Sequence, residues 1–317
     1  MFLIIGTVTA DLLVQTPTPL AALGGDGFRS SNLLFTDAPL TISMGGNGGN
    51  AAYVLAGLGA ATALAGAVGH DLLGDALVGW LAGRGVNLDG LARSPTHATS
   101  TSTILLTGAE NQVVYHHLGA SSQAEYATIP RPLLDATQVL LASSFSILAR
   151  LRAGGFAQAL ARVKNQGGIT GLDIGPAIGP PVTLDEVRPL LADVDYLLAN
   201  SHELLALTGR DSWPDAAEDV LAAGAKALVI KQGRDGSSLW CGEDRLHVPA
   251  FRVQTNVSVG AGDAFNVGFL YAIRQGWAAE EALGFGNGVA ALVVANPKGI
   301  LAAPSLADVK AFVAAHG

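Results

Sequence analysis

The sequence predicts an α/β fold, in which a mostly parallel sheet is covered by helices on both faces. Short apolar runs rich in β-forming residues occur at 2–5, 139–142, 169–173, 195–199 and 227–230. Stretches with helical periodicity lie between several of these runs, for example 152–165 and 201–208. The 317 residues are 50% hydrophobic and 14% charged, which is enough apolar material for one large core. Such alternation is typical of a parallel sheet whose binding sites lie at the carboxyl ends of its strands.

Two Thr- and Val-rich segments, 99–107 and 112–118, have a different pattern and predict a hairpin joined by A-E-N. With neighbouring β-like stretches they predict a small antiparallel β lid, built from lid segments at approximately 11–44 and 97–120. Because these segments interleave with the early strands of the main sheet, we expect 1–317 to form a single domain.

Composition and charge limit the classes of partner. A formal net charge of −8 and the absence of a Lys/Arg run argue against a nucleic-acid surface. The uncharged stretch 51–69 contains several glycines and predicts helix, turn and strand, not a membrane span. The start of the chain, M-F-L-I-I-G, is too short for a signal peptide and has no basic residue. A single cysteine, Cys241, excludes an intramolecular disulfide and fits a reducing compartment, so we expect a cytoplasmic protein.

The most informative motif is V-G-A-G-D-A-F at 259–265, where Gly260, Ala261 and Gly262 lead directly into Asp263 and a helical pattern follows. A glycine-rich turn that opens a helix directs free N–H groups and the positive end of the helix dipole toward an anion. A carboxylate there would repel a bound phosphate, so its presence needs an explanation. It is explained if the carboxylate accepts the proton of a hydroxyl that attacks the phosphoryl group held by the N–H groups. The alternative is that Asp263 is only a helix N-cap.

A second glycine cluster, M-G-G-N-G-G-N-A-A at 44–52, precedes another helical pattern. The amides of Asn47 and Asn50 can donate and accept hydrogen bonds toward a polyhydroxylated ligand without adding charge. The alternative is a flexible turn capped by asparagine. No G-K-[ST] follows, so the cluster is not a Walker A loop.

Taken together, the two clusters resemble the signatures of the PfkB-type carbohydrate kinase family, which has the ribokinase-like fold. The resemblance covers essentially the whole chain. Its other pieces are I-I-G-T-V-T-A-D ending at Asp11, G-H-D-L-L-G at 69–74, N-S-H-E at 200–203, K-Q-G-R-D-G at 231–236 and P-K-G at 297–299. It implies an ATP-dependent kinase that uses Mg²⁺ and transfers the γ-phosphoryl group to a hydroxyl of a sugar or sugar-like small molecule. Two alternatives remain open, a nucleoside kinase of the same fold and a non-catalytic ligand-binding or regulatory member.

The resemblance also implies a role for each matching residue. Asp263 is expected to be the catalytic base, and the N–H groups of Gly260, Ala261 and Gly262 are expected to stabilise the transferring phosphoryl group. The expected acceptor-binding residues are Asp11, Gly46, Asn47 and Asn50. The expected nucleotide-binding residues are Lys231, Gly233, Gly236, Asn287 and Lys298. Asn200 and Glu203 are expected to order Mg²⁺ through water, and the same pair also fits a helix capping box.

The sequence departs from the family pattern just before Asp263. The family commonly has D-T-T there, whereas this chain has V-S-V at 257–259. Because Val257 lacks the carboxylate that helps to hold a monovalent cation, we expect activity that does not depend on potassium. Similarly, 142–146 offers no carboxylate where ribokinases use one on the sugar, which favours an acceptor other than ribose.

Three further residues and the exposed edge of the lid can also be interpreted from the sequence. Asp71, in the segment 69–74, can be a structural cap of a turn. His116 and His117 alternate in direction along the lid hairpin, so one can meet a substrate while the other faces solvent. The exposed edge of the lid can pair with a second subunit to form a homodimer.

Overall fold

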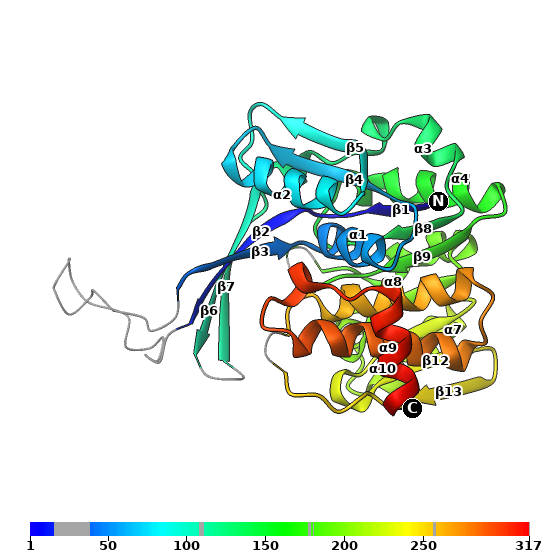
Figure 1. Ribbon diagram of the computed structural model, residues 1–317. Coiled ribbons are helices and arrows are strands. Elements are labelled where there is room, and N and C mark those ends of the chain that lie inside the picture. The colour runs from blue at the N-terminus through cyan, green and yellow to red at the C-terminus, as the bar shows by residue number, and fades with distance from the viewer. Residues whose placement is uncertain (16–38, 108–110, 177–178, 180, 256–257, 317) are drawn as a thin grey trace, which may run out of the picture.

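The computed structural model describes residues 1–15, 39–107, 111–176, 179, 181–255 and 258–316. Within these residues the main element is a nine-stranded sheet with helices on both faces (Figure 1). From one edge to the other its strands are β13 (Asp244–Val248), β12 (Ser237–Cys241), β11 (Leu228–Lys231), β10 (Tyr196–Asn200), β9 (Ile169–Asp173), β8 (Val139–Ala142), β1 (Phe2–Ile5), β4 (Thr62–Gly69) and β5 (Asn87–Ser94). The strands from β11 to β5 in this order are parallel, whereas β12 is antiparallel to both of its neighbours, β11 and β13. The predicted fold class is confirmed.

Helices bury both faces of the parallel strands. In β1, Phe2 and Ile4 belong to one apolar core and Leu3 and Ile5 to the other, because successive side chains of a strand point to opposite faces. The first core is covered by α1 (Asn47–Gly57), α2 (Leu72–Gly83), α8 (Ala261–Arg274), α9 (Ala279–Ala295) and α10 (Leu306–His316). The second core is covered by α3 (Arg131–Asp135), α4 (Phe156–Asn165), α5 (Leu184–Val187), α6 (Ser201–Thr208) and α7 (Trp213–Ala222).

One predicted helix begins later than its periodicity indicates. The pattern over 152–165 includes the turn Leu151–Gly155, in which Gly154 has a positive φ of 127°. This conformation interrupts the α-helical backbone, and the regular helix α4 starts at Phe156.

The lid is a separate four-stranded sheet that projects from the main body in Figure 1. Its order is β3 (Thr41–Gly45), β2 (Thr9–Gln15), β6 (Ser100–Thr107) and β7 (Asn111–His117). The two outer pairs are antiparallel as predicted, but the central pair of β2 with β6 is parallel. Parallel pairing is possible here because the chain passes through β4 and β5 of the main sheet before it returns to the lid. The predicted lid residues 16–38 lie outside the described part of the chain.

No helix in the described part of the chain is long and apolar enough to cross a membrane.

Asp71 is the N-cap of α2, which confirms its structural interpretation. Its carboxylate accepts hydrogen bonds from the backbone N–H of Gly74 (2.8 Å) and from the backbone N–H and hydroxyl of Thr99 (2.7 and 2.6 Å). Burial opposes the charge of Asp71, but these hydrogen bonds outweigh it and lower its pKa. The cap therefore joins the start of α2 to the segment that leads into the lid strand β6.

We expect Asp71→Ala to lower the free energy of unfolding by about 1–2 kcal/mol in urea at pH 7, because a helix cap and its hydrogen bonds are lost. Since the pKa of Asp71 is lower in the folded protein, its contribution is fully present above the unfolded pKa. The difference between wild type and variant should therefore shrink as the pH falls through the folded pKa.

The control is Asp75→Ala in the same helical turn. The Asp75 side chain is 66% exposed and forms a surface ion pair with Arg93, so its loss should cost about 0.5 kcal/mol or less. Equal losses in the two variants would contradict the role of Asp71.

Candidate active site

A cavity of about 510 Å³ lies at the carboxyl ends of the parallel strands, beside the start of α8. Strands β9, β10 and β11 end in Asp173, Asn200 and Lys231, and all three residues line the cavity. The lid contributes Thr9, Asp11, Ser102, Ile104, Val114 and His116. The cavity therefore lies between the main sheet and the lid, at the sheet edge where parallel α/β proteins bind their ligands.

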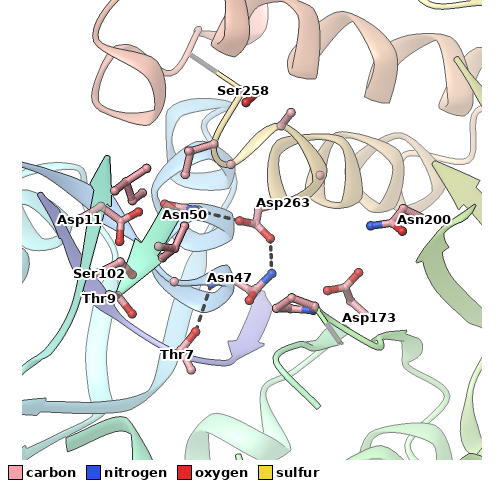
Figure 2. A pocket seen from close by; sticks show the side chains of 18 of the residues that line it. Thr7, Thr9, Asp11, Asn47, Asn50, Ser102, Asp173, Asn200, Ser258 and Asp263 are labelled. Carbon is pink, nitrogen blue, oxygen red and sulfur yellow. Dashed lines mark hydrogen bonds between the residues drawn. The ribbon is translucent and has the colours of Figure 1, made fainter. Parts of the chain in front are cut away.

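Asp263 occupies the first turn of α8, and its carboxylate lies between two amides in Figure 2. Oδ1 accepts a hydrogen bond from Nδ2 of Asn47 and Oδ2 accepts one from Nδ2 of Asn50, each at 2.8 Å. Burial and, next, the charge of Asp173 raise the pKa of Asp263 to about 7, although the two amides and Lys231 lower it. A carboxylate with this pKa can accept a proton from a hydroxyl near neutral pH.

Two glycines allow the tight turns before the helices that carry these residues. Gly46, the N-cap of α1, has a φ of 77°, and a Cβ there would lie 2.6 Å from the carbonyl oxygen of Thr7. Gly260, the N-cap of α8, has a φ of 83°, and a Cβ there would lie 2.6 Å from the side chain of Ile300. Both positions are therefore restricted to glycine by conformation and by space. The turn at Gly260 presents the first N–H groups of α8, and the positive end of its dipole, to the cavity.

A second cavity of about 560 Å³ adjoins the first. The residues that line both cavities are Lys231, Gly233, Ser258, Ala261 and Gly262. The second cavity is also lined by Gly236 and Asn287. The amide of Asn287 donates to the carbonyl oxygens of Val248 (3.1 Å) and Pro249 (3.2 Å) and so holds part of the cavity wall. The two cavities therefore meet at the N-terminus of α8.

A buried ion pair lies at this junction. The Nζ of Lys231 donates to Oδ1 of Asp173 at 2.7 Å, and the amide of Asn266 donates to the same oxygen at 3.0 Å. The side chain of Asp173 is 1% exposed and that of Lys231 is 13% exposed. Burial opposes the charge of Lys231, but the carboxylates of Asp173 and Glu203 outweigh it and raise its pKa.

The sequence interpretation did not single out Asp173 or Asn266. A signal for Asp173 was present, because a carboxylate at the last residue of a buried parallel strand lies at the edge where sites form. Asn266 lies one helical turn after Asp263 on α8. Its burial and its contact with Asp173 distinguish it from a helix-surface residue, and neither can be seen in the sequence.

Asn200 and Glu203 form a capping box at the start of α6. Oδ1 of Asn200 accepts the N–H of Glu203 at 2.8 Å, and Oε2 of Glu203 accepts the N–H of Asn200 at 2.7 Å. Burial raises the pKa of Glu203. Both residues also line the first cavity, so capping leaves the pair accessible from the site. In the described ranges no group of three or more His, Cys, Asp or Glu residues has the arrangement of a metal site.

A polar row crosses the lid at the other end of the first cavity. Asp11 on β2 is paired in register with Ser102 on β6, which is paired with His116 on β7. Ser102 donates a hydrogen bond to Asp11, and its Oγ lies 3.1 Å from Nδ1 of His116. Asp11 is 4% exposed, and burial raises its pKa to about 6 although the bond from Ser102 lowers it. Burial also lowers the pKa of His116, with His117 adding to the effect.

Most of the predicted site residues lie together. The first cavity is lined by Asp11, Gly46, Asn47, Asn50, Asn200, Glu203, Lys231, Gly233, Gly260, Ala261, Gly262 and Asp263. Of the two lid histidines, His116 lines it and His117 does not.

Lys298 is the exception among the predicted nucleotide-binding residues. It lines a small cavity of about 30 Å³ that also involves Asp11, and it does not line the 560 Å³ cavity. The reason is that the following turn, Gly299–Ala302, packs against β3 of the lid. Val257, on which the monovalent-cation prediction rests, lies outside the described residues.

Comparison with known proteins gives a consistent assignment. Residues 28–306 match the model of the pfkB family carbohydrate kinases. The 5-dehydro-2-deoxygluconokinase of Clostridium perfringens is 25% identical over 282 residues, which cover 85% of this chain and 83% of that protein. The ATP-dependent ribose-1-phosphate kinase of Halopiger xanaduensis is 29% identical over 273 residues, with 86% of each chain covered. The structure of Arabidopsis thaliana ribokinase complexed with ribose and ATP has a TM-score of 0.82 and 23% identity, with 98% of each chain covered.

The fold and the paired cavities are those of a phosphotransferase that acts on an alcohol group. The chain belongs to the pfkB family of carbohydrate kinases, and its fold is ribokinase-like. The predicted resemblance is therefore confirmed, and the nucleoside-kinase and non-catalytic alternatives are not favoured.

The Lys231–Asp173 pair makes a prediction about stability. We expect Lys231→Met to lower the free energy of unfolding by about 3–5 kcal/mol, because it leaves the buried carboxylate of Asp173 without its cation. Urea unfolding at pH 7 measures the loss.

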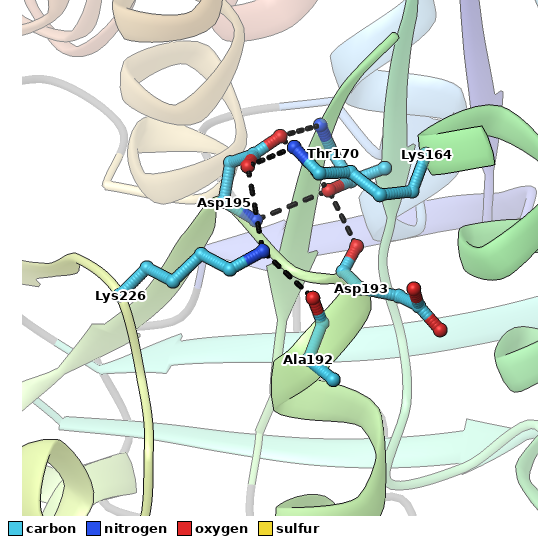
Figure 3. Close-up of polar contacts among 6 residues, drawn as sticks. All are labelled: Lys164, Thr170, Ala192, Asp193, Asp195 and Lys226. Atoms are coloured by element: carbon cyan, nitrogen blue, oxygen red, sulfur yellow. Dashed lines mark hydrogen bonds and ion pairs between the residues drawn. The ribbon is translucent and has the colours of Figure 1, made fainter. Parts of the chain in front are cut away.

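A second Asp–Lys pair in the same sheet supplies the control. Asp195 lies at the amino end of β10 and forms an ion pair with Lys164 at 2.5 Å (Figure 3). Its carboxylate also lies 3.9 Å from Nζ of Lys226 and accepts a hydrogen bond from the backbone N–H of Thr170. Lys164→Met leaves these other partners in place and should cost about 1 kcal/mol or less. A Lys231→Met variant as stable as Lys164→Met would show that water in the cavity already screens Asp173.

Proposed function

We propose that this protein transfers the γ-phosphoryl group of ATP to a hydroxyl of a sugar, with Asp263 as the general base. The observation that carries the proposal is the position of the Asp263 carboxylate, which lies at the N-terminus of α8 where two cavities meet. One cavity is lined on one side by the lid and suits the acceptor, and the other suits the nucleotide. The phosphoryl group then passes directly over the first turn of α8.

The reaction follows from this arrangement. Asp263 accepts the proton of the acceptor hydroxyl while the oxygen attacks the γ-phosphorus, and the bond from that phosphorus to the bridging oxygen of ADP breaks. The N–H groups of Gly260, Ala261 and Gly262 stabilise the negative charge on the transferring group. Lys231 lies at the same junction and contributes a positive charge there.

The remaining roles are assigned by position. In the acceptor cavity, Gly46, Asn47 and Asn50 lie near Asp263, and Asp11 lies on the lid strand β2. Gly233, Gly236 and Asn287 line the nucleotide cavity, and Lys298 is not assigned to it.

Asn200 and Glu203 fit Mg²⁺, because both line the cavity and carry oxygen donors, and one carboxylate with one amide suits an ion that keeps most of its waters. When bound, Mg²⁺ would neutralise charge on the ATP phosphates.

The proposed base predicts a pH profile. In the wild type, kcat/KM should rise with pH through about 7 as Asp263 loses its proton. Asp263→Asn should lower kcat by at least ~10²-fold and change both KM values only a few-fold, since the shape is kept and the proton acceptor is lost. Near-native turnover by this variant would remove Asp263 from the mechanism.

Asp173→Asn provides a second arm of the same experiment. Because the negative charge of Asp173 raises the pKa of Asp263, its removal should shift the acid limb of the profile to lower pH. Asp195→Asn, at the opposite edge of the sheet, should leave the limb in place. If the rise of kcat/KM with pH does not move in Asp173→Asn, a group other than Asp263 causes it.

We also propose that the lid forms a homodimer. Both edge strands of the lid expose apolar side chains, with Ile42 on β3 41% exposed and Tyr115 on β7 64% exposed. Exposed strand edges with apolar side chains pair readily with a second chain. A second copy of the lid has the matching apolar surface.

The double variant Ile42→Glu/Tyr115→Glu should therefore be monomeric at a concentration at which light scattering finds the wild type dimeric. The control is Leu72→Glu on α2, which removes a large apolar side chain outside the lid that is 87% exposed and should leave the dimer intact. A monomeric wild type at tens of micromolar would contradict the proposal.

A further inference from the structure

Ser144 has a backbone conformation that is unusual for its residue type. Among the residues that the structure describes, it is the only one other than glycine whose φ is positive, at 61°. Residues with a side chain rarely adopt this conformation, because the Cβ crowds the backbone. Glycine adopts it without that cost, so the serine side chain is expected to have a role that offsets the strain. Strained residues of this kind gather at functional sites.

Ser144 lies just beyond the carboxyl ends of two neighbouring strands. β1 and β8 are parallel, and their last residues, Ile5 and Ala142, are paired in register. Thr7 and Ser144 each follow two residues later, and they are only 1% and 0% exposed. The backbone N–H of Thr7 donates to Oγ of Ser144 at 3.2 Å, and the two hydroxyl oxygens lie 3.0 Å apart. The register of the main sheet therefore brings these two side chains together.

The hydrogen bonds continue from this pair of hydroxyls to the carboxylate of Asp263. Oγ of Ser144 donates to Oδ1 of Asn47 at 3.2 Å, and Nδ2 of Asn47 donates to Oδ1 of Asp263 at 2.8 Å. The backbone N–H of Asn47 donates to Oγ1 of Thr7 at 3.2 Å. Figure 2 shows the bonds that join Asn47 to Asp263 on one side and to Thr7 on the other.

The direction of these bonds follows from the number of protons, since each hydroxyl has only one. If Ser144 donates to Asn47, Thr7 can donate to Ser144, and both hydroxyl protons have an acceptor. If Ser144 instead donates to Thr7, Oδ1 of Asn47 loses its donor and the Thr7 proton has no acceptor within the set. The first arrangement satisfies more groups, so the donors run from Thr7 through Ser144 and Asn47 to Asp263.

This direction fixes the orientation of the Asn47 amide. Half a turn of an amide exchanges its oxygen for its nitrogen. Because the hydroxyl of Ser144 donates to the oxygen, the nitrogen is directed at Asp263. A turned amide would place its oxygen against the carboxylate and repel it. Ser144 lines neither of the two cavities, so its effect on Asp263 passes through Asn47.

We propose that Ser144 is a positioning residue for the base, whose hydroxyl holds the Asn47 amide with its nitrogen toward Asp263. The strained backbone of Ser144 is retained because it aims the hydroxyl at the amide. The inference rests on the proposed kinase function, in which Asp263 accepts the proton of the acceptor.

The orientation of the Asn47 amide affects the charge of Asp263. The groups that act on this carboxylate from other elements are Asn47 and Asn50 of α1, Asp173 of β9, Glu203 of α6 and Lys231 of β11. Of these, Asn47 accepts the hydrogen bond of Ser144, and its own bond to Asp263 lowers the pKa of that carboxyl. Loss of the Ser144 hydroxyl should therefore raise the pKa of Asp263, while the other groups stay in place.

Ser144→Gly tests the contact, because it removes the hydroxyl and keeps the positive φ without strain. The Asn47 amide can then turn, and the pKa of Asp263 should rise by about half a unit to one unit. With ATP, Mg²⁺ and D-ribose or D-fructose, kcat/KM should fall about three- to tenfold at pH 6 but less than about twofold at pH 9, where the carboxylate is ionised in both proteins. A merely structural loss would lower kcat/KM equally at both pH values.

NMR measures the same pKa without turnover. The carboxyl carbon of Asp263 is followed through a pH titration in protein that carries isotope-labelled aspartate, and its signal is identified by its absence from Asp263→Asn. The pKa should be higher in Ser144→Gly than in the wild type. Ser144→Ala, which also lacks the hydroxyl, should give a rise of similar size.

The matched control is Ser143→Ala in the same turn. Ser143 is 1% exposed, and its hydroxyl donates to the carbonyl oxygen of Ile5 at 3.0 Å. The variant therefore loses a buried hydroxyl and its hydrogen bond, as Ser144→Ala does, but keeps the contact of Ser144 with Asn47. Both the pKa of Asp263 and the pH dependence of kcat/KM should stay as in the wild type.

The outcomes separate this inference from the proposed function. An unchanged pKa of Asp263 in Ser144→Gly, or an equal rise in Ser143→Ala, would overturn the positioning role and leave the kinase function standing. If the wild type phosphorylates no sugar in a panel of pentoses, hexoses and ketoses, the proposed function fails, and the NMR titration still decides whether Ser144 positions the amide.

Discussion

The site depends on one pair of hydrogen bonds, those from Asn47 and Asn50 to the carboxylate of Asp263. They join residues 216 and 213 positions apart in the chain. A carboxylate that is 8% exposed is tolerated only when its oxygens are hydrogen-bonded. The bonds also bring the first turns of α1 and α8 together, so the positive ends of two helix dipoles converge on one carboxylate. The position of the base is therefore fixed by the packing of two helices on the same face of the sheet.

The charges around this base are not balanced. Asp263, Asp173 and Glu203 interact with one buried cation, Lys231. Burial, together with the charge of Asp173, keeps the pKa of Asp263 near neutrality, where a weaker carboxylate acid is a better base. The excess of carboxylates costs stability, and a divalent cation with bound phosphates is the kind of ligand that can offset it. The same feature therefore serves the reaction and makes the empty site less stable.

Local patterns predicted those parts of the fold that local interactions determine. The runs at 2–5, 139–142 and 169–173 coincide with β1, β8 and β9, because strands buried on both faces are continuous apolar runs. The glycine clusters predicted a helix after each of them. The helices α1 and α8 begin within the clusters, at Asn47 and Ala261, because only glycine fits at their N-caps, Gly46 and Gly260. Long-range pairing could not be predicted this way. The parallel pairing of β2 with β6, and the contact of Asp173 with a lysine 58 residues away, both depend on how the whole chain folds.

The main sheet and the lid contribute different residues to the site. Asp173, Asn200 and Lys231 end strands of the main sheet, whereas in the proposed function one row of the lid meets the acceptor at the far end of the cavity. In that row Asp11, Ser102 and His116 are direct cross-strand neighbours. A one-residue slip of either strand pair would turn one member to the other face and break the chain of hydrogen bonds. In the proposed function, the register of the lid strands is therefore a determinant of acceptor choice. Side chains within the row can change while Asp263 and the nucleotide cavity remain intact.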